Sequence, residues 1–184
     1  MTLQPSELTW LRELFQDREG PLLRYAERMT GDLERARDAV QEAFLHLCSL
    51  DPSKLESARE SGDIVGWLYT VCRHRIIDYQ RKERRMCMID PVDVDTRPVD
   101  AESPSQQLER HQNLHHVVRI IETLPSQQQE VVVLKFQNGL SYKQIAQIME
   151  LSVSHVGVLL HTAMKAIREQ MVQLEAVPSR RRMS

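Results

Sequence analysis

A stretch of 21 residues without helical periodicity divides this chain into two parts. Residues 86–106, MCMIDPVDVDTRPVDAESPSQ, contain three prolines and five acidic side chains. Proline has no amide hydrogen to donate, and it disfavours a helical backbone in the residue before it, so the stretch predicts an acidic flexible linker. The 184 residues then form two small domains, each with a modest core, rather than one large enzyme.

The composition is that of a chain that folds in water. Hydrophobic residues make up 41% and charged residues 27% of the chain, which excludes wholesale disorder. No apolar run reaches the length of about 18 residues that a membrane span needs, and the start, MTLQPSELTW, lacks an export signal. We therefore expect a cytoplasmic protein without membrane insertion. A linker of this length spans roughly 25 to 30 Å, so its two domains can lie apart on one extended partner.

Neither a metal site nor a catalytic centre is predicted. The three cysteines, Cys48, Cys72 and Cys87, are widely spaced and form no C-x-x-C pair. His111 and His115 have the spacing of two metal ligands on a helix, but no ligand of a third type lies close in the sequence. Motifs for a nucleophile, for paired carboxylates or for a phosphate-binding loop are absent from the sequence, so we expect no cofactor and no small-molecule substrate.

Two amphipathic helices are predicted between Leu22 and Leu47. Apolar residues recur there at intervals of three and four, and the pattern breaks at Thr30-Gly31-Asp32. Gly31 suits the left-handed position after the first helix, and Asp32 can cap the amides of the second. The second helix contains DAVQEAFLHL, whose polar flank carries Asp38, Gln41 and Glu42.

A third helix over 63–85 changes character along its length. Asp63 is a plausible cap, and Trp67 and Leu68 are predicted core residues. Residues 67–85 carry six basic and two acidic side chains, all of them beyond Cys72. Arginine and lysine neutralise phosphates, and an aromatic ring can stack on an unpaired base, so this end predicts contact with nucleic acid. The candidates are Arg73, His74, Tyr79, Arg81, Lys82, Arg84 and Arg85.

The second domain, 107–175, is predicted to contain a helix-turn-helix. A helix over 107–123 ends at Leu124-Pro125, after which Ser126 can cap QQQEVVVLKF. Asn138-Gly139 is a turn signal, Ser141 can cap YKQIAQIM, and a last helix starts near Val153. A short helix, a tight turn and a second helix form the DNA-binding pattern. The expected fold class is all-α, with a basic tail over 176–184.

The last helix has few basic residues to attract phosphates. If it enters the major groove, the residues near its start and one turn further on lie closest to the base edges. Those residues, with the first lysine beyond them, are Ser154, His155, Val158, His161, Thr162 and Lys165. Such side chains suit thymine methyl groups and single hydrogen bonds rather than bidentate guanine contacts. We expect weak DNA binding by this domain, with a shallow dependence on salt.

Three blocks of the sequence resemble a bacterial extracytoplasmic-function sigma factor. They are LLRYAERMTGDLERARDAVQEAFLHL, GWLYTVCRHRIIDYQRKERR and LPSQQQEVVVLKFQNGLSYKQIAQIMELSVSHVGVLLHTAMKAIRE, and they cover most of residues 20–170. The resemblance implies two helical domains that bind core RNA polymerase and direct promoter recognition and opening. It implies no catalytic activity, and it implies an anti-sigma factor as a further partner.

The resemblance also assigns roles to the candidate residues. Asp38, Gln41 and Glu42 fall on the block that docks on the polymerase clamp helices, and the basic helix falls on the blocks that bind the minus-ten promoter element. His74 stands where the family often has asparagine. The last helix would read the minus-thirty-five element, and Glu150 occupies a turn position that is usually glycine. The acidic linker matches the segment that threads through the polymerase cleft.

Two other classes of protein compete with this interpretation. A LuxR-like transcription regulator can have a similar C-terminal sequence, but it should lack WLYTVCRHRIIDYQRKERR and needs an upstream sensory domain. A helical protein-interaction adaptor would leave the basic aromatic helix unexplained. Binding to purified core polymerase distinguishes the three classes.

Overall fold

The computed structural model describes residues 5–61, 63–86 and 116–176, and these residues contain helices and no strand. The all-α prediction is confirmed. None of the helices in these ranges is long and apolar enough to span a membrane. The helices are α1 (Pro5–Thr30), α2 (Leu33–Cys48), α3 (Pro52–Ser61), α4 (Ile64–Met86), a helix over 116–122, α6 (Ser126–Val132), the π-helix η1 (Val133–Gln137), α7 (Tyr142–Met149) and α8 (Val153–Ala176).

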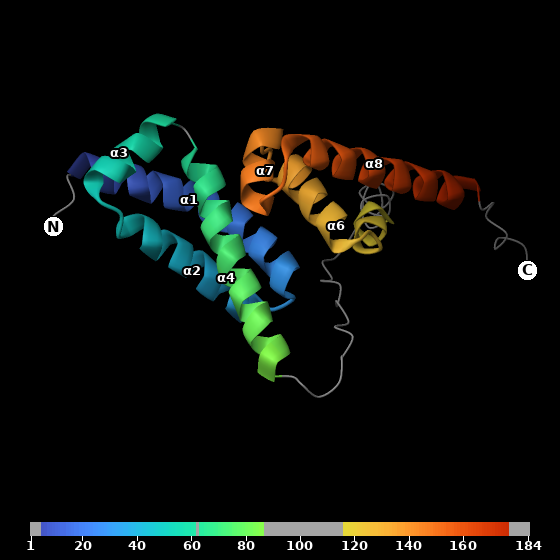
Figure 1. Cartoon of the computed structure of the whole chain (residues 1–184), viewed down its shortest axis with the longest axis horizontal. Coiled ribbons are helices and arrows are strands. Elements are labelled where there is room, and N and C mark those ends of the chain that lie inside the picture. The colour runs from blue at the N-terminus through green and yellow to red at the C-terminus, as the bar shows by residue number, and fades with distance from the viewer. Residues whose placement is uncertain (1–4, 62, 87–115, 177–184) are drawn as a thin grey trace, which may run out of the picture.

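Helices α1, α2 and α4 pack around the N-terminal core (Figure 1). The core residues follow the apolar periodicity of the sequence; those from α1 and α2 include Leu22, Tyr25, Ala36, Ala43 and Leu47, and those from α4 include Leu68, Tyr69, Cys72 and Ile76. Gly31 has φ 67°, and the Asp32 carboxylate accepts hydrogen bonds from the amides of Glu34 and Arg35. The predicted break and cap between the first two helices are therefore confirmed.

Two N-terminal features were not predicted. Helix α1 begins at Pro5 and continues through Pro21, whereas the apolar pattern of the sequence predicts this helix only from Leu22. Trp10, Leu11 and Leu14 pack partly buried against the core, so the added turns are held by tertiary contacts rather than by the backbone bond that Pro21 cannot donate. Helix α3 is short and polar, and Leu55 is its buried anchor.

The C-terminal domain contains the predicted helix-turn-helix. The Ser141 hydroxyl accepts a hydrogen bond from the Gln144 amide, and the Gln144 side chain accepts one from the Ser141 amide, so a complete capping box starts α7. Ala146 lies buried where α7 packs on α8. The prediction that Ser126 caps α6 is wrong, because α6 already begins at Ser126 and is preceded by Pro125 without a side-chain cap. Proline fixes φ near the helical value and supplies this start instead.

The ends of the domains lie partly outside the described residues. Helix α4 reaches Met86 and α8 reaches Ala176. The remainder of the predicted linker, the first part of the predicted helix over 107–123, and the basic tail from residue 177 onward are not among the described residues. His111, His115 and Cys87 belong to the same undescribed set.

Glu150 occupies a strained turn between α7 and α8. Its φ and ψ are 57° and 41°, the left-handed region in which a Cβ atom crowds the backbone. We expect Glu150→Gly to raise the free energy of unfolding by about 1 kcal/mol, because glycine carries no such strain. Urea denaturation followed by circular dichroism measures the change. Glu150→Ala is the matched control, since it removes the same carboxylate but keeps the strain; equal stability of the two variants would contradict the prediction.

The two domains pack against each other through α4 and α7. Figure 1 shows α7 between α4 on one side and α8 on the other. Gly66 lies at this contact, since a Cβ atom there would be 3.4 Å from Cγ of Gln144. The absence of a side chain at Gly66 thus lets α7 approach α4 closely. The sequence had indicated only that the domains could lie apart.

Candidate nucleic-acid interface

The acidic flank of α2 presents two of its three candidate residues to solvent. Asp38 and Gln41 are exposed, whereas Glu42 is half-buried. Both carboxylate oxygens of Glu42 pair with the guanidinium group of Arg75 on α4. Glu42 is therefore held inside the N-terminal domain, and Asp38 and Gln41 are the members of the set that a partner can contact directly.

A groove lies beside Gln41, between α1 and α2. Its volume is about 550 Å³. Phe15 and Phe44 pack edge to face at 4.8 Å in its wall, and Leu45 is 60% exposed at its rim. The full lining is Phe15, Glu19, Leu23, Arg37, Val40, Gln41, Phe44, Leu45 and Cys48. The acidic flank of α2 thus continues into an apolar surface.

The C-terminal part of α4 is anchored by its own polar side chains. Gln80 donates a hydrogen bond to the Met29 carbonyl of α1 at 2.9 Å, and Glu83 pairs with Arg35 of α2. The Arg75 guanidinium lies over the Tyr79 ring at 4.6 Å from its centroid. The contacts of Gln80 and Glu83 hold the end of α4 against α1 and α2. The cation–π contact with Arg75 holds the Tyr79 ring in place on this helix.

The basic candidates of α4 fall into two groups. Arg81 and Lys82 are exposed and lie beyond the contact with the C-terminal domain, as does Tyr79. Arg84 and Arg85 follow on the same helix, but their side chains are outside the described set. Arg73 and His74 instead face the C-terminal domain, so the structure does not bring all the predicted strand-binding residues onto one open surface.

Arg73 takes part in a buried cluster across the domain contact. Its Nε donates to Oε1 of Glu130 on α6 at 2.7 Å, and the Tyr25 hydroxyl donates to the same oxygen at 2.8 Å. Glu130 is 5% exposed and is the charged residue most deeply buried among those that the structure describes. A carboxylate removed from water in this way needs such charged and hydrogen-bonding partners.

The electrostatic environment of this cluster favours the charged form of Arg73 and the neutral form of Tyr25. Burial lowers the pKa of Arg73, but the hydrogen bond and the negative charge of Glu130 outweigh burial, so its pKa is raised overall. Burial, together with Glu130, holds the pKa of Tyr25 well above its usual value. Nearby Cys72 has its pKa raised to about 12 by burial. Cys72 thus remains a protonated core residue rather than a reactive thiolate.

Further polar contacts join the domains, two of them made by His74 and Tyr69 of α4. His74 Nε2 lies 2.8 Å from Oε1 of Glu150, and the Tyr69 hydroxyl donates to Oδ1 of Asn138 at 2.6 Å. The Tyr69 ring packs edge to face on the Tyr25 ring at 5.2 Å. We call the set Tyr25, Tyr69, Arg73, His74, Glu130, Asn138 and Glu150 the domain seam.

Sequence reasoning missed the C-terminal half of this seam. The sequence offers one signal of a buried charge here, because Glu130 directly precedes the apolar run Val131-Val132-Val133-Leu134. Asn138 had been interpreted only as a turn residue, whereas its side-chain amide also donates to the Val133 carbonyl and ends the π-helix. No local pattern reveals that its oxygen accepts a hydrogen bond from Tyr69.

The start of α8 forms the exposed face that the sequence predicted. Ser154, His155, Val158, His161, Thr162 and Lys165 are all exposed. The Thr162 hydroxyl donates to the Val158 carbonyl at 2.9 Å, so part of its hydrogen-bonding capacity is already used. The Ser152 hydroxyl accepts from the His155 amide and caps the helix. This face is therefore available to a partner; its side chains are mostly polar, with Val158 the apolar one and Lys165 the one lysine among the six.

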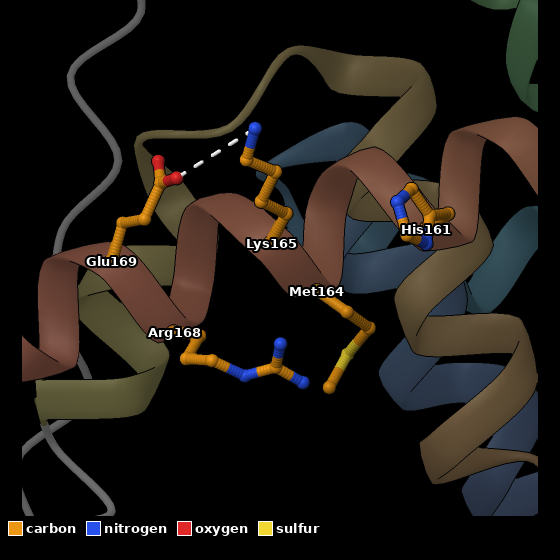
Figure 2. Close-up of a pocket in the computed structure, with 5 residues that line it drawn as sticks. All are labelled: His161, Met164, Lys165, Arg168 and Glu169. Carbon is orange, nitrogen blue, oxygen red and sulfur yellow. Dashed lines mark ion pairs between the residues drawn. The ribbon is translucent and has the colours of Figure 1, made fainter.

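Further along α8, a shallow pocket of about 310 Å³ carries the basic residues of the helix (Figure 2). Lys165 leans toward Glu169, with Nζ 3.9 Å from Oε1, while Arg168 points to the other side of the helix near Met164. An exposed pair at this distance contributes little to stability. Lys165 is partly neutralised by Glu169, which agrees with a weak attraction for phosphate.

An acidic flank, an anchored basic helix and an exposed helix-turn-helix face in one all-helical chain define a DNA-binding transcription protein. Residues 14–86 match the family model described as Sigma-70 region 2, and residues 115–167 match the one described as Sigma-70, region 4. Together these matches cover more than half of the chain. The chain belongs to the sigma-70 family, as a member of its extracytoplasmic-function (ECF) group.

Curated relatives agree over nearly the whole length. The RNA polymerase sigma factor YlaC of Bacillus subtilis (strain 168) is 27% identical over 164 residues, which are 89% of this chain and 92% of the relative. The ECF RNA polymerase sigma factor SigL of Mycobacterium tuberculosis (strain ATCC 25618 / H37Rv) is 27% identical over 169 residues, 92% of this chain and 93% of the relative. The LuxR-like alternative is not favoured, because the region 2 match includes the basic helix.

A solved structure supports the fold. Sigma factor RpoE of Bartonella quintana, crystallised with the anti-sigma factor NepR, has a TM-score of 0.57 and 18% sequence identity. The similarity covers 87% of this chain and 97% of that chain. The two small helical domains expected from the sequence are thus a known arrangement.

Proposed function

We propose that this chain is an alternative sigma factor that docks on core RNA polymerase through α2 and handles the minus-ten strand through α4. The observation that carries the proposal is the anchored end of α4, where exposed Arg81 and Lys82 follow the Tyr79 ring. Cations beside an aromatic ring suit the phosphates and bases of a single strand. The acidic flank at Asp38 and Gln41 lies on a different helix, so both partners can be bound at once.

The proposed division of the chain follows the sequence. Residues 1–85 would dock on polymerase and open the promoter, 86–106 would link the domains, and 107–175 would read upstream DNA. Among the strand-binding residues, Arg81, Lys82, Arg84 and Arg85 would contact phosphates, and His74 and Tyr79 would contact bases. The similar sigma factor RpoE was crystallised with an anti-sigma factor, which supports a similar partner here. Partners of this kind support a cytoplasmic location for the protein.

Upstream recognition is proposed to be weak in the free protein. The exposed face at the start of α8 offers a valine, a serine and histidines, and the nearest lysine is partly neutralised by Glu169. Few phosphate contacts give low non-specific affinity and a shallow salt dependence. Holding the domain beside DNA on the polymerase raises its effective concentration without adding contacts, so upstream affinity should depend on tethering.

Reconstitution with bacterial core polymerase tests the function. The purified chain is expected to elute with core polymerase in size-exclusion chromatography and to support run-off transcription from a promoter selected from a random library. Scrambling the upstream element should lower, but not abolish, the yield of transcript. Failure to co-elute with core polymerase would exclude the sigma-factor function, while transcription that ignores the upstream sequence would exclude DNA reading by α8.

A further inference from the structure

We propose that Arg75 is a positioning residue for base recognition, which holds the Tyr79 ring in the orientation that a base of the minus-ten strand requires. The inference rests on the proposed function, because Tyr79 is one of the two residues proposed to contact bases. Arg75 itself is not among the proposed DNA-binding residues. It acts through Tyr79, and Glu42 of α2 in turn fixes Arg75.

The guanidinium group of Arg75 uses its edge and its face for different partners. At the edge, Nη2 donates to Oε1 of Glu42, and Nε pairs with Oε2 of the same carboxylate. The face covers the Tyr79 ring, with Cζ 4.6 Å from the ring centroid. A planar, delocalised cation can make both kinds of contact at once, whereas the ammonium group of lysine is a point charge. The arrangement therefore depends on arginine rather than on positive charge alone.

These three residues connect two helices. Arg75 and Tyr79 are four positions apart on α4, so their side chains lie one above the other on the same face of the helix. Glu42 reaches Arg75 from α2, and the side chains of Arg75 and Glu42 are 32% and 41% exposed. A carboxylate that engages a guanidinium group through both of its oxygens fixes the plane of that group. The orientation of the ring on α4 is thus set from α2.

The Tyr79 ring also remains within reach of a ligand. Tyr79 is half-buried, and the exposed side chains of Arg81 and Lys82 follow it on the same helix. Because Arg75 covers one face of the ring, a base is left with the other face or with the hydroxyl group. Arg75 therefore limits the directions from which a base can approach Tyr79.

Positioning of the ring affects base preference more than total affinity. A ring that turns freely still stacks on any base, since every base has a flat face. Preference for one base requires the ring and its hydroxyl group to stay in place, because hydrogen bonds depend steeply on distance and angle. Loss of Arg75 should therefore flatten the preference at the position that Tyr79 contacts, while the phosphate contacts further along α4 remain.

The experiment compares promoters that differ in one minus-ten base. Core polymerase is saturated with each variant of the full chain, so that weaker docking does not enter the result. Its affinity is then measured for the promoter selected from a random library and for every single-base change in the minus-ten element. Tyr79→Ala first identifies the position that the ring contacts.

At that position we expect Arg75→Ala to reduce the discrimination between the preferred base and the others by about two- to fivefold, the range of an exposed cation–π contact. Discrimination at the other minus-ten positions should stay unchanged. A uniform loss of affinity over all minus-ten variants, with discrimination intact, is what a merely structural role predicts, and it would overturn the proposal.

Arg75→Lys separates positioning from charge. This variant keeps a cation near Glu42, but it cannot place one planar group against both the carboxylate and the ring. We expect discrimination to fall as in Arg75→Ala. Full discrimination in the lysine variant would overturn the proposal, because charge alone would then suffice.

Glu42→Gln tests the link to α2. It should reduce discrimination at the same minus-ten position, and it should have no further effect when Arg75 is already alanine. Additive losses in the double variant would show that Glu42 acts on its own, and they would overturn the orientation of Arg75 by α2.

Arg35→Ala is the matched control for the anchoring of α4. It removes another ion pair between α2 and α4, that of Arg35 with Glu83, without touching the contact between Arg75 and Tyr79. We expect its discrimination to equal that of the natural sequence. Equal losses in the Arg35 and Arg75 variants would mean that both arginines only anchor the helix, and would overturn the proposal.

Folding and function are checked separately. Circular dichroism verifies that each variant folds; if Arg75→Ala does not, Arg75→Lys and Glu42→Gln carry the test with the same criteria. If Tyr79→Ala changes a preference and the Arg75 variants do not, only the positioning role is wrong. If Tyr79→Ala leaves the preference unchanged at every minus-ten position, Tyr79 contacts no base, and the base contact in the proposed function is wrong as well.

Discussion

Replacing Asp38 and Gln41 with lysine is expected to weaken binding to core RNA polymerase by at least about 30-fold. Both side chains are exposed on α2, and loss of a charged contact at a desolvated interface typically costs about 2 to 5 kcal/mol. Glu42 is left unchanged, because its carboxylate pairs with Arg75 and its loss would also disturb the fold. Surface-immobilised core polymerase and a concentration series of each variant measure the dissociation constant.

The control for this experiment carries the same change in charge elsewhere. Glu56→Lys with Ser57→Lys alters two exposed residues of α3, which has no proposed contact with polymerase. We expect its affinity to equal that of the natural sequence. If the Asp38 and Gln41 variant remained helical and bound polymerase as tightly as this control, the α2 docking surface would be wrongly placed.

Replacing Arg81 and Lys82 with alanine is expected to weaken single-stranded DNA binding by at least about 100-fold. Each hydrogen bond to a charged group is worth about 1.5 kcal/mol at the lower end, and both side chains are exposed beyond the seam. Two lost phosphate contacts should also reduce the slope of log affinity against log salt by about 1.4. Anisotropy titrations at several salt concentrations give both quantities.

Two further variants make this result specific. Arg12→Ala with Lys54→Ala removes the same charge from exposed positions on α1 and α3. If this control lost as much affinity for DNA as the α4 variant, net charge would explain the loss and contacts of Arg81 and Lys82 would not.

His74→Ala should flatten the base preference at one minus-ten position and leave the slope of log affinity against log salt unchanged. Unchanged preference at every minus-ten position would remove His74 from the proposed site.

Local sequence signals predicted most of the helices because each signal acts within a few residues. Gly31 with Asp32, and Ser141 with Gln144, define helix ends through bonds that span two or three positions. The left-handed backbone at Glu150 agrees with the family resemblance, in which this turn position is usually glycine. By contrast, α1 upstream of Pro21 and the short α3 depend on packing that no local pattern specifies.

The residues of the candidate site also divide into those that local helical spacing predicted and those that it could not predict. Exposed residues such as Arg81 and Ser154 lie where helical spacing placed them. The partners of Arg73 and His74 come from positions 57 and 76 residues away in the chain, and separation of that size leaves no periodic trace in one sequence. The π-helix was equally inaccessible, since its extra residue per turn arises where Asn138 bonds back to Val133.

Arg75 links two surfaces that serve different partners. One face of its guanidinium group covers the Tyr79 ring, and its nitrogens hold Glu42 on the helix that carries the docking flank. Substitutions at positions 42 and 79 are therefore not independent, since either one changes the environment of the same arginine. Across related chains we expect residues 42, 75 and 79 to vary together, so that adaptation to a different polymerase constrains which promoters remain usable.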